Sequence, residues 1–163
     1  MRPTSDRLRE TLFNILAPKI VGSRFLDICA GSGAVGIEAL SRGAAAVTFV
    51  DLSRNACRII EANLEVLGAQ SSTTIVNRDA ASALRRLEKE SERFDIVFFD
   101  PPYSSGVYSQ VLKQLGLGRV LEDGVILIVE HRAKTPPEPV YGKLRIFREV
   151  KQGDSALAFY EAF

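Results

Sequence analysis

Three closely spaced glycines mark the stretch of this sequence with the most evident chemistry. Residues 25–36 begin with an apolar run that stops at a turn containing Gly31 and Gly33, and Gly36 follows within a helical pattern. Glycine adopts backbone angles closed to other residues and lets a ligand lie against the backbone. The free N–H groups at a helix start suit a carboxylate or a phosphate. The stretch therefore predicts a nucleotide-type site at the carboxyl end of a first strand, where open α/β sheets bind ligands.

Acidic residues around this turn narrow the choice of ligand. The three glycines, with Asp51 about twenty residues further on, also match the fingerprint of dinucleotide-binding proteins. However, Asp27 lies in the strand just before the glycines, where its carboxylate would repel a pyrophosphate and attract an ammonium group. A second motif, Asp100-Pro101-Pro102-Tyr103, has no role in hydride transfer.

These residues resemble the motifs of a known enzyme family. Asp27 to Gly33 is similar to the first motif of class I S-adenosylmethionine-dependent methyltransferases, and Asp51 to their ribose-binding acid. Asp100 to Tyr103 resembles the (Asp/Asn)-Pro-Pro-(Tyr/Phe) motif of the members that methylate exocyclic or amide nitrogens. The opening, Arg2 to Asn14, resembles the RsmD family, bacterial methyltransferases of a guanine-N2 amine in small-subunit (16S) ribosomal RNA. The likeness runs over nearly the whole chain.

The resemblance implies an α/β, Rossmann-like class I methyltransferase fold. Its sheet would have seven mostly parallel strands in the order 3-2-1-4-5-7-6, with helices on both faces. We expect a single domain over residues 1–163, in which residues 1–22 form an N-terminal helix over the cofactor site. Family members usually carry an N-terminal hairpin before Arg-Pro-Thr; here Met1 directly precedes Arg2, so we expect that hairpin to be absent.

Hydrophobic periodicity supports the same architecture, because strands alternate with helices and a hairpin closes the chain. Leu8, Leu12 and Leu16 recur at helical spacing after a cap at Thr4 or Ser5. The expected strands are 25–28, 46–51, 73–77, 94–99, 124–130, 143–151 and 156–163, and the later helices are 53–67, 80–90 and 107–115.

The family pattern also assigns a cofactor, S-adenosyl-L-methionine. Leu52 would flank the adenine ring, Asp79 would accept from its amino group, and the Ala80 N–H would donate to a ring nitrogen. In the alternative interpretation, Asp51 and Asp79 only cap the helices that follow them. The complete set of expected cofactor-binding residues is Asp27, Ala30, Gly31, Gly33, Asp51, Leu52, Asp79 and Ala80.

The expected catalytic residues are Asp100, Pro101, Pro102 and Tyr103. The Asp100 carboxylate and the Pro101 carbonyl would accept the two hydrogens of the target amine, which frees its lone pair and stabilises the charge that develops on nitrogen. The prolines fix the backbone, and Tyr103 offers a face on which an unstacked base can lie. The target nucleotide must therefore be single-stranded, looped or flipped out.

Two basic segments are candidates for contact with ribosomal RNA or the small ribosomal subunit. Residues 1–24 carry five basic against two acidic side chains, and residues 132–151 carry six against two. Either segment could equally be an ordinary solvated surface. In the family the first helix lies over the cofactor pocket, which makes Arg2, Thr4, Arg7 and Glu10 candidate substrate-binding residues.

Composition excludes several classes of protein. The chain has 163 residues, 46% of them hydrophobic and 25% charged, with a net charge of +1, which is typical of a globular domain and not of a polycation. No apolar run has membrane-spanning length. The two cysteines give neither a disulfide framework nor metal-ligand spacing. We expect a cytoplasmic monomer that needs no metal.

Other functions remain open at this point. The same motif serves methylation of adenine-N6 in DNA or RNA and of a glutamine side chain in a protein. The glycine spacing alone would also suit an NAD-dependent oxidoreductase. A module that only binds the methyl donor is a further alternative, although the intact Asp100 motif argues against it.

Overall fold

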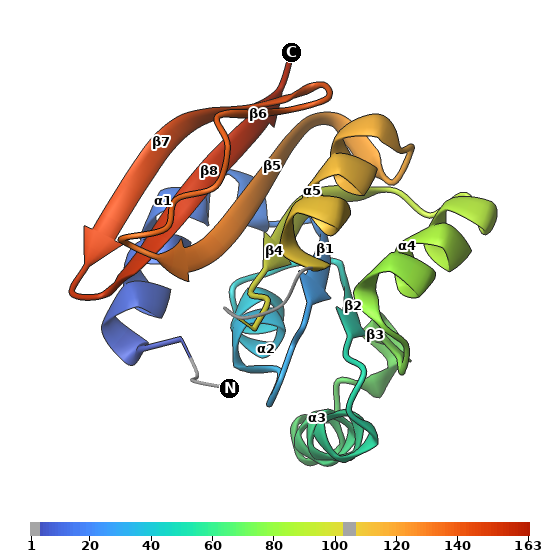
Figure 1. Cartoon of the computed structure of the whole chain (residues 1–163). Coiled ribbons are helices and arrows are strands. Elements are labelled where there is room, and N and C mark those ends of the chain that lie inside the picture. Colours follow the sequence, from blue (N-terminus) through green and yellow to red (C-terminus); the bar gives the residue numbers. More distant parts are fainter. Residues whose placement is uncertain (1–3, 103–106) are drawn as a thin grey trace.

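The computed structural model describes residues 4–102 and 107–163, in which helices cover both faces of one mixed β-sheet (Figure 1). Strands and helices alternate until the fifth strand, and antiparallel strands close the chain, as predicted. No helix in these two ranges is long and apolar enough to cross a membrane. The elements are α1 (Asp6–Ile20), β1 (Arg24–Ile28), α2 (Ala34–Ser41), β2 (Ala46–Val50), α3 (Arg54–Leu67), η1 (Gln70–Ser72), β3 (Thr73–Val76), α4 (Ala80–Lys89), β4 (Phe94–Phe99), α5 (Val107–Leu117), β5 (Leu121–Arg132), β6 (Val140–Tyr141), β7 (Leu144–Gln152) and β8 (Ser155–Ala162).

The strands lie in the order β3-β2-β1-β4-β5-β8-β7-β6. The first five run parallel, and the last three pair antiparallel. The expected number of seven strands is wrong, because the described residues form eight. The additional strand, β6, has two residues at the sheet edge; without it, the predicted order is recovered. Gly142, with φ at +57°, makes the turn that folds β6 onto β7. So short a strand after a proline-rich loop shows no alternation in the sequence.

Two apolar layers hold the helices against the sheet. One layer joins α1, α2 and α3 to one face through side chains such as Leu12, Val35 and Ile60. The other joins α4 and α5 to the opposite face through side chains such as Leu84 and Leu112. The doubly wound arrangement is therefore confirmed, and it leaves the carboxyl ends of the parallel strands as the edge from which loops can reach a ligand.

The first helix begins where the sequence predicts. The Ser5 hydroxyl accepts a hydrogen bond from the Leu8 N–H at 3.2 Å and caps α1. Leu8, Leu12 and Leu16 are almost completely buried, so the predicted helical stripe faces the sheet.

Strand register brings four acidic residues to the same edge of the sheet. Ile28 of β1 lies between Val50 of β2 and Phe99 of β4, and Phe99 pairs with Val129 of β5. Each of these positions is one residue away from an acidic side chain. Those side chains are Asp27, Asp51, Asp100 and Glu130, and all four are buried.

Candidate active site

The glycine turn between β1 and α2 has the backbone geometry that its sequence predicts. Gly31 and Gly33 have φ values of +59° and +83°, which favour glycine, and Gly33 is the N-cap of α2. Gly36 is required for a different reason: a Cβ atom there would lie 2.4 Å from the Phe49 ring of β2. The third glycine of the motif thus lets α2 pack directly on the sheet.

Asp27 is buried beneath this turn. Its carboxylate accepts a hydrogen bond from the Gly36 N–H at 3.0 Å and is only 1% exposed. Burial raises the pKa of Asp27 to about 7; the Gly36 N–H opposes the rise, and the negative charge of Asp51 adds to it. A cation placed in the pocket would favour the ionised carboxylate.

Asp51 connects the glycine turn to the loop after β2. One carboxylate oxygen accepts from the Gly31 N–H at 2.9 Å, and the other accepts from the Ser53 N–H at 2.8 Å. The Asn77 side chain donates to the Asp51 backbone carbonyl at 3.1 Å and so joins the ends of β2 and β3. Each carboxylate oxygen keeps a further lone pair, which is compatible with a ribose hydroxyl as an additional donor.

Asp100 follows β4 on the other side of β1. Burial raises the pKa of Asp100 to about 8, and the negative charges of Glu130 and Asp27 contribute to the rise. Pro101 is buried directly after it, whereas Pro102 is exposed. Tyr103 lies outside the described residues, so its predicted place beside a base stays a prediction.

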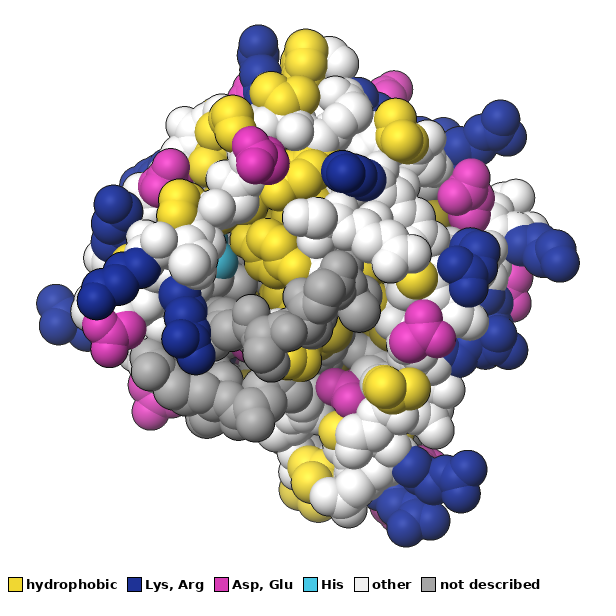
Figure 2. Space-filling model, viewed as in Figure 1, with side chains coloured by type: hydrophobic (Ala, Val, Ile, Leu, Met, Phe, Trp, Pro, Cys, Tyr) yellow, Lys and Arg dark blue, Asp and Glu magenta, His cyan; other side chains and the backbone are white. Residues whose placement is uncertain are grey.

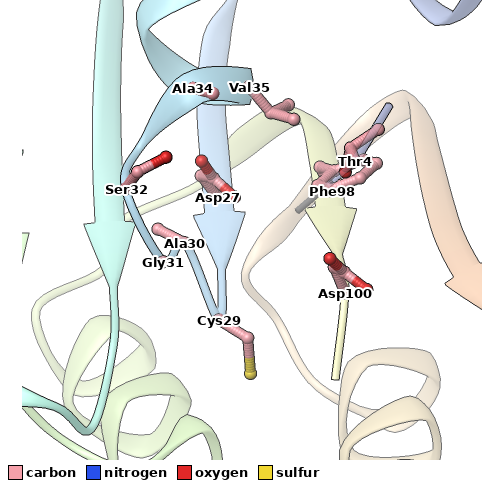
Figure 3. A pocket seen from close by; sticks show the side chains of 10 residues that line it. All are labelled: Thr4, Asp27, Cys29, Ala30, Gly31, Ser32, Ala34, Val35, Phe98 and Asp100. Atoms are coloured by element: carbon pink, nitrogen blue, oxygen red, sulfur yellow. The ribbon is translucent and has the colours of Figure 1, made fainter. Parts of the chain in front are cut away.

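One pocket collects most of these groups (Figure 3). Asp27 and Asp100 reach it from neighbouring strands, and Thr4 lies beside Phe98 on the same side as Asp100. The lining also includes Cys29, whose pKa is raised to about 12 by burial and by the charges of Asp51, Asp100 and Asp27, so its thiol stays protonated. The lining residues are Thr4, Asp27, Cys29, Ala30, Gly31, Ser32, Ala34, Val35, Phe98 and Asp100.

The predicted adenine-binding residues lie away from this lining. Leu52 is 72% exposed after β2, and Ala80 is buried at the start of α4. The Asp79 carboxylate accepts from the Ser82 N–H at 2.9 Å and caps α4, which is the alternative that the sequence left open. Its second oxygen takes no part in that bond, so contact with the cofactor remains a prediction.

The N-terminal candidates divide into two groups. Thr4 lines the pocket, whereas Arg7 and Glu10 are exposed on α1. Arg2 lies outside the described residues. Sequence reasoning missed Glu130, which is 3% exposed at the end of β5 and bonded to Thr4. Its signal was an acid at the end of an almost entirely apolar strand, which is the same signal that identified Asp51 and Asp100.

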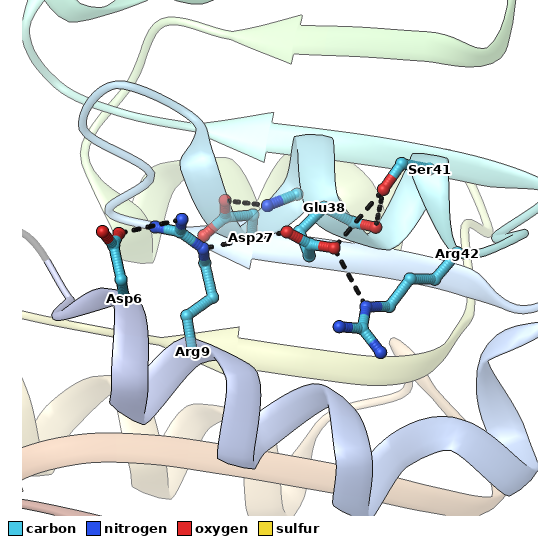
Figure 4. Close-up of polar contacts among 7 residues, drawn as sticks. Asp6, Arg9, Asp27, Glu38, Ser41 and Arg42 are labelled. Atoms are coloured by element: carbon cyan, nitrogen blue, oxygen red, sulfur yellow. Dashed lines mark hydrogen bonds and ion pairs between the residues drawn. The ribbon is translucent and has the colours of Figure 1, made fainter.

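Polar contacts fix α1 against α2, next to the glycine turn (Figure 4). Arg9 pairs with Asp6 at 3.0 Å and lies 3.9 Å from Glu38 of α2. Glu38 also accepts from Arg42 at 2.9 Å. The Arg42 guanidinium lies 5.3 Å from the centre of the Phe13 ring of α1. The start of α1 is thereby held where Thr4 can reach the pocket.

Comparison with known proteins identifies the family. The chain matches the family described as "Conserved hypothetical protein 95" over residues 1–161. It is 37% identical over 161 residues to the ribosomal RNA small subunit methyltransferase D of Escherichia coli K12, covering 99% of this chain and 79% of that protein. The chain belongs to the RsmD family. The other relatives of this RsmD-family protein include YlbH of Bacillus subtilis 168, which is 33% identical over 98% of this chain and 87% of YlbH.

Solved structures share the fold of this RsmD-family chain. The Escherichia coli protein yhhF superposes with a TM-score of 0.87 at 35% identity, covering 99% of this chain and 88% of that one. A more distant protein, SMU.776, was solved as a complex with SAH; it has a TM-score of 0.72 at 17% identity and covers 94% of this chain and 49% of that one. The distant match bears on the fold alone.

The residues of the pocket fit a cationic methyl donor. Asp27 and Asp100 are buried acids whose pKa values are raised to about 7 and about 8, and the charges of their acidic neighbours contribute to both rises. S-adenosylmethionine carries an ammonium and a sulfonium, which are the charges such a site would stabilise. No group of three or more His, Cys, Asp or Glu side chains in residues 4–102 and 107–163 could hold a metal ion.

Proposed function

We propose that this protein transfers a methyl group from S-adenosyl-L-methionine to the exocyclic N2 amine of a guanine in small-subunit ribosomal RNA. The observation that carries the proposal is the buried Asp100, which precedes Pro101-Pro102 and lines one pocket together with Asp27 and the glycine turn. The family relationship supplies the substrate class, because the relative from Escherichia coli is a ribosomal RNA small subunit methyltransferase.

Each of the cofactor-binding residues would contact a different part of the ligand. Asp27 would hold the ammonium group, since its carboxylate lies under the turn. Asp51 would accept from the ribose hydroxyls. Gly31 and Gly33 keep the space above the backbone free of side chains. When bound, the cofactor supplies an activated methyl group on a sulfonium, which is a strong leaving group.

Asp100 and the Pro101 carbonyl would act on the nucleophile. The exocyclic amine of guanine is conjugated with the ring, so its lone pair is poorly available. Acceptors aimed at both amine hydrogens favour a pyramidal nitrogen and stabilise the positive charge that develops on it. An ionised Asp100 is the stronger acceptor and offsets the positive charge on the nitrogen, so its pKa of about 8 in the ligand-free protein makes that step sensitive to pH.

The RNA would approach over the carboxyl ends of the strands. The N–H of Ala133 donates to the Asp154 carbonyl at 2.8 Å, which joins the loop after β5 to the β7–β8 turn. Arg132, Lys134 and Lys151 are exposed there, and we call these three the basic rim. Lys and Arg side chains gather over the ends of β5 and β7, at the left in Figure 2. Such a surface suits the phosphates that flank an unstacked guanine.

The test is transfer of a labelled methyl group from S-adenosylmethionine to unmodified small ribosomal subunits and to naked 16S RNA, followed by nucleoside analysis. Label in N2-methylguanosine is the expected result, and the better of the two substrates shows whether assembly comes first. Label in N6-methyladenosine, or in a protein glutamine, would overturn the guanine assignment while keeping the methyl transfer. Preference for NAD over S-adenosylhomocysteine in equilibrium binding would overturn the cofactor assignment.

A further inference from the structure

A hydrogen bond joins the segment before α1 to the end of β5. The Thr4 hydroxyl donates to a Glu130 carboxylate oxygen at 2.5 Å, across 126 residues of sequence. Such short bonds to an ionised acceptor are among the stronger ones in proteins. Thr4 lines the pocket, so the bond fixes one of its walls.

Glu130 also lies beside Asp100. Phe99 of β4 pairs with Val129 of β5. The residues that follow them, Asp100 and Glu130, therefore lie next to each other. The negative charge of Glu130 contributes to the raised pKa of Asp100. Glu130 is 3% exposed, so solvent screens the interaction of its charge with Asp100 much less than it would at the surface.

We propose that Glu130 is a positioning residue for methyl transfer with two roles. Its carboxylate holds Thr4 in the pocket wall by the hydrogen bond. Its negative charge favours binding of the cationic methyl donor over binding of the neutral product. The inference rests on the proposed function, because a preference for the methyl donor matters only if the protein transfers methyl groups. Both of its parts are nevertheless measurable on cofactor binding alone, without RNA. A site that prefers the donor releases the product more readily after each transfer.

The charges around Asp100 define the expected dependence on pH. Asp27 on β1, the Cys29 thiol after β1 and Glu130 on β5 are the described titratable groups that bear on this corner of the pocket. The Cys29 thiol is protonated over the accessible range. Removal of the Glu130 charge therefore leaves Asp27 as the acid beside Asp100, and Asp100 would ionise at a lower pH than in the unmodified protein.

Four variants separate the bond from the charge. Thr4→Val removes the hydroxyl while keeping the shape, and Thr4→Ser restores a hydroxyl. Glu130→Gln keeps an oxygen acceptor for Thr4 and removes the charge. Ser5→Ala is the matched control, because it removes the cap of α1 from the adjacent residue and leaves Thr4 and Glu130 intact.

Binding of S-adenosylmethionine and S-adenosylhomocysteine is measured by calorimetry between pH 6 and pH 9. Thr4→Val should weaken both ligands about tenfold, as expected for loss of a hydrogen bond to a charged group, while Thr4→Ser stays near the unmodified protein. Glu130→Gln should lower the preference for the methyl donor about fivefold, given the strength of partly screened charges. In Glu130→Gln, the affinity for S-adenosylmethionine should also begin to increase at a lower pH than in the unmodified protein.

Two results would overturn the inference. One is a Thr4→Val protein that binds both ligands like the unmodified protein. The other is a Glu130→Gln protein with an unchanged donor preference and pH midpoint. If Ser5→Ala altered the preference as much as Glu130→Gln does, a general loosening of α1 would explain the effect and the inference would also fall. Failure to methylate RNA would bear on the proposed function and leave these measurements valid.

Discussion

Four acidic side chains lie at the ends of four neighbouring strands, and their burial gives this site its chemical character. Asp51 accepts from a backbone N–H of the glycine turn and Asp27 from the Gly36 N–H in the first turn of α2, which fixes the direction of both carboxylates. Asp100 and Glu130 lie on the other side of β1, beside each other and near Thr4. A site with this charge favours a cation, and a transferable methyl group on a sulfonium is such a ligand.

The first prediction concerns Asp100. Asp100→Ala should lower kcat for RNA methylation by about 10²–10³-fold, as for loss of a transition-state hydrogen-bond acceptor, and should leave S-adenosylhomocysteine binding within a few-fold. Asp100→Asn keeps one acceptor oxygen, so we expect it to retain more activity than Asp100→Ala. Because an ionised Asp100 stabilises the developing positive charge better than a protonated one, kcat/KM of the unmodified protein should rise with pH toward about 8, whereas the Asp100→Asn profile lacks that limb. Full activity of Asp100→Ala would remove Asp100 from the mechanism.

At the scale of elements, the packing of α2 on β2 positions the acid beneath the turn. Gly36 contributes both the close approach to Phe49 and the N–H that Asp27 accepts. The α1 contacts through Arg9, Glu38 and Arg42 then hold the N-terminal segment over the same region.

A second prediction follows from that packing. Gly36→Ala should destabilise the protein by about 1–3 kcal/mol, since its Cβ would lie 2.4 Å from a buried ring and overpacking costs that much. It should also weaken S-adenosylmethionine binding, because the turn shifts. Denaturant unfolding and calorimetry measure the two effects. Adding Phe49→Leu to Gly36→Ala should restore part of the stability and part of the binding. If it restored neither, contact with the Phe49 ring would not be the cause of the losses.

At the scale of the whole molecule, the buried acids Asp27 and Asp100 make the free energy of unfolding depend on pH. The folded protein holds protons on Asp27 and Asp100 up to about pH 7 and pH 8, whereas in the unfolded chain these groups lose them near the ordinary aspartate pKa of 3.8. Their contribution to stability is therefore fully present below about pH 4 and is lost as pH rises through 7 to 8.

We accordingly expect the ligand-free protein to lose about 3 kcal/mol of unfolding free energy per group between pH 5 and pH 8, given 1.36 kcal/mol per pKa unit. Chemical unfolding across that range measures the loss. Asp27→Asn should flatten the profile, and saturating S-adenosylmethionine should restore stability at pH 8. Asp123→Asn, at an exposed position of β5, is a control that leaves the slope unchanged. An identical slope in Asp27→Asn would contradict the assignment.

The basic rim gives a prediction about the surface of the molecule. Replacing Arg132, Lys134 and Lys151 together with glutamine should weaken RNA binding and reduce the slope of log K against log salt by about 2, as expected for three phosphate contacts to a single strand. Cofactor binding should not change. Replacement of three exposed cations elsewhere, Arg85, Lys89 and Arg119, removes the same charge and serves as the control. Equal losses from both sets would mean that net charge, rather than the rim, attracts the RNA.

Local signals were sufficient for most of the fold. The glycine turn, the cap of α1 and the end of α3 at Leu67 depend on neighbouring residues, and all three are where the sequence predicts them. β4 spans the predicted residues 94–99, while β5 extends beyond its predicted ends to Leu121–Arg132. The two-residue β6 escaped prediction because a strand of that length is specified by its partner, β7, and not by its own pattern.

The sequence by itself determined the order of the elements, the glycine turn and the acids that close β1, β2 and β4, because each depends on residue types at short spacing. Only the tertiary structure decided which distant residues meet. Thr4 and Glu130 are 126 residues apart, and no local pattern specifies their bond. The protonation of Asp27 and Asp100 was likewise decided by the fold, since burial and neighbouring charge, rather than residue type, set their pKa values.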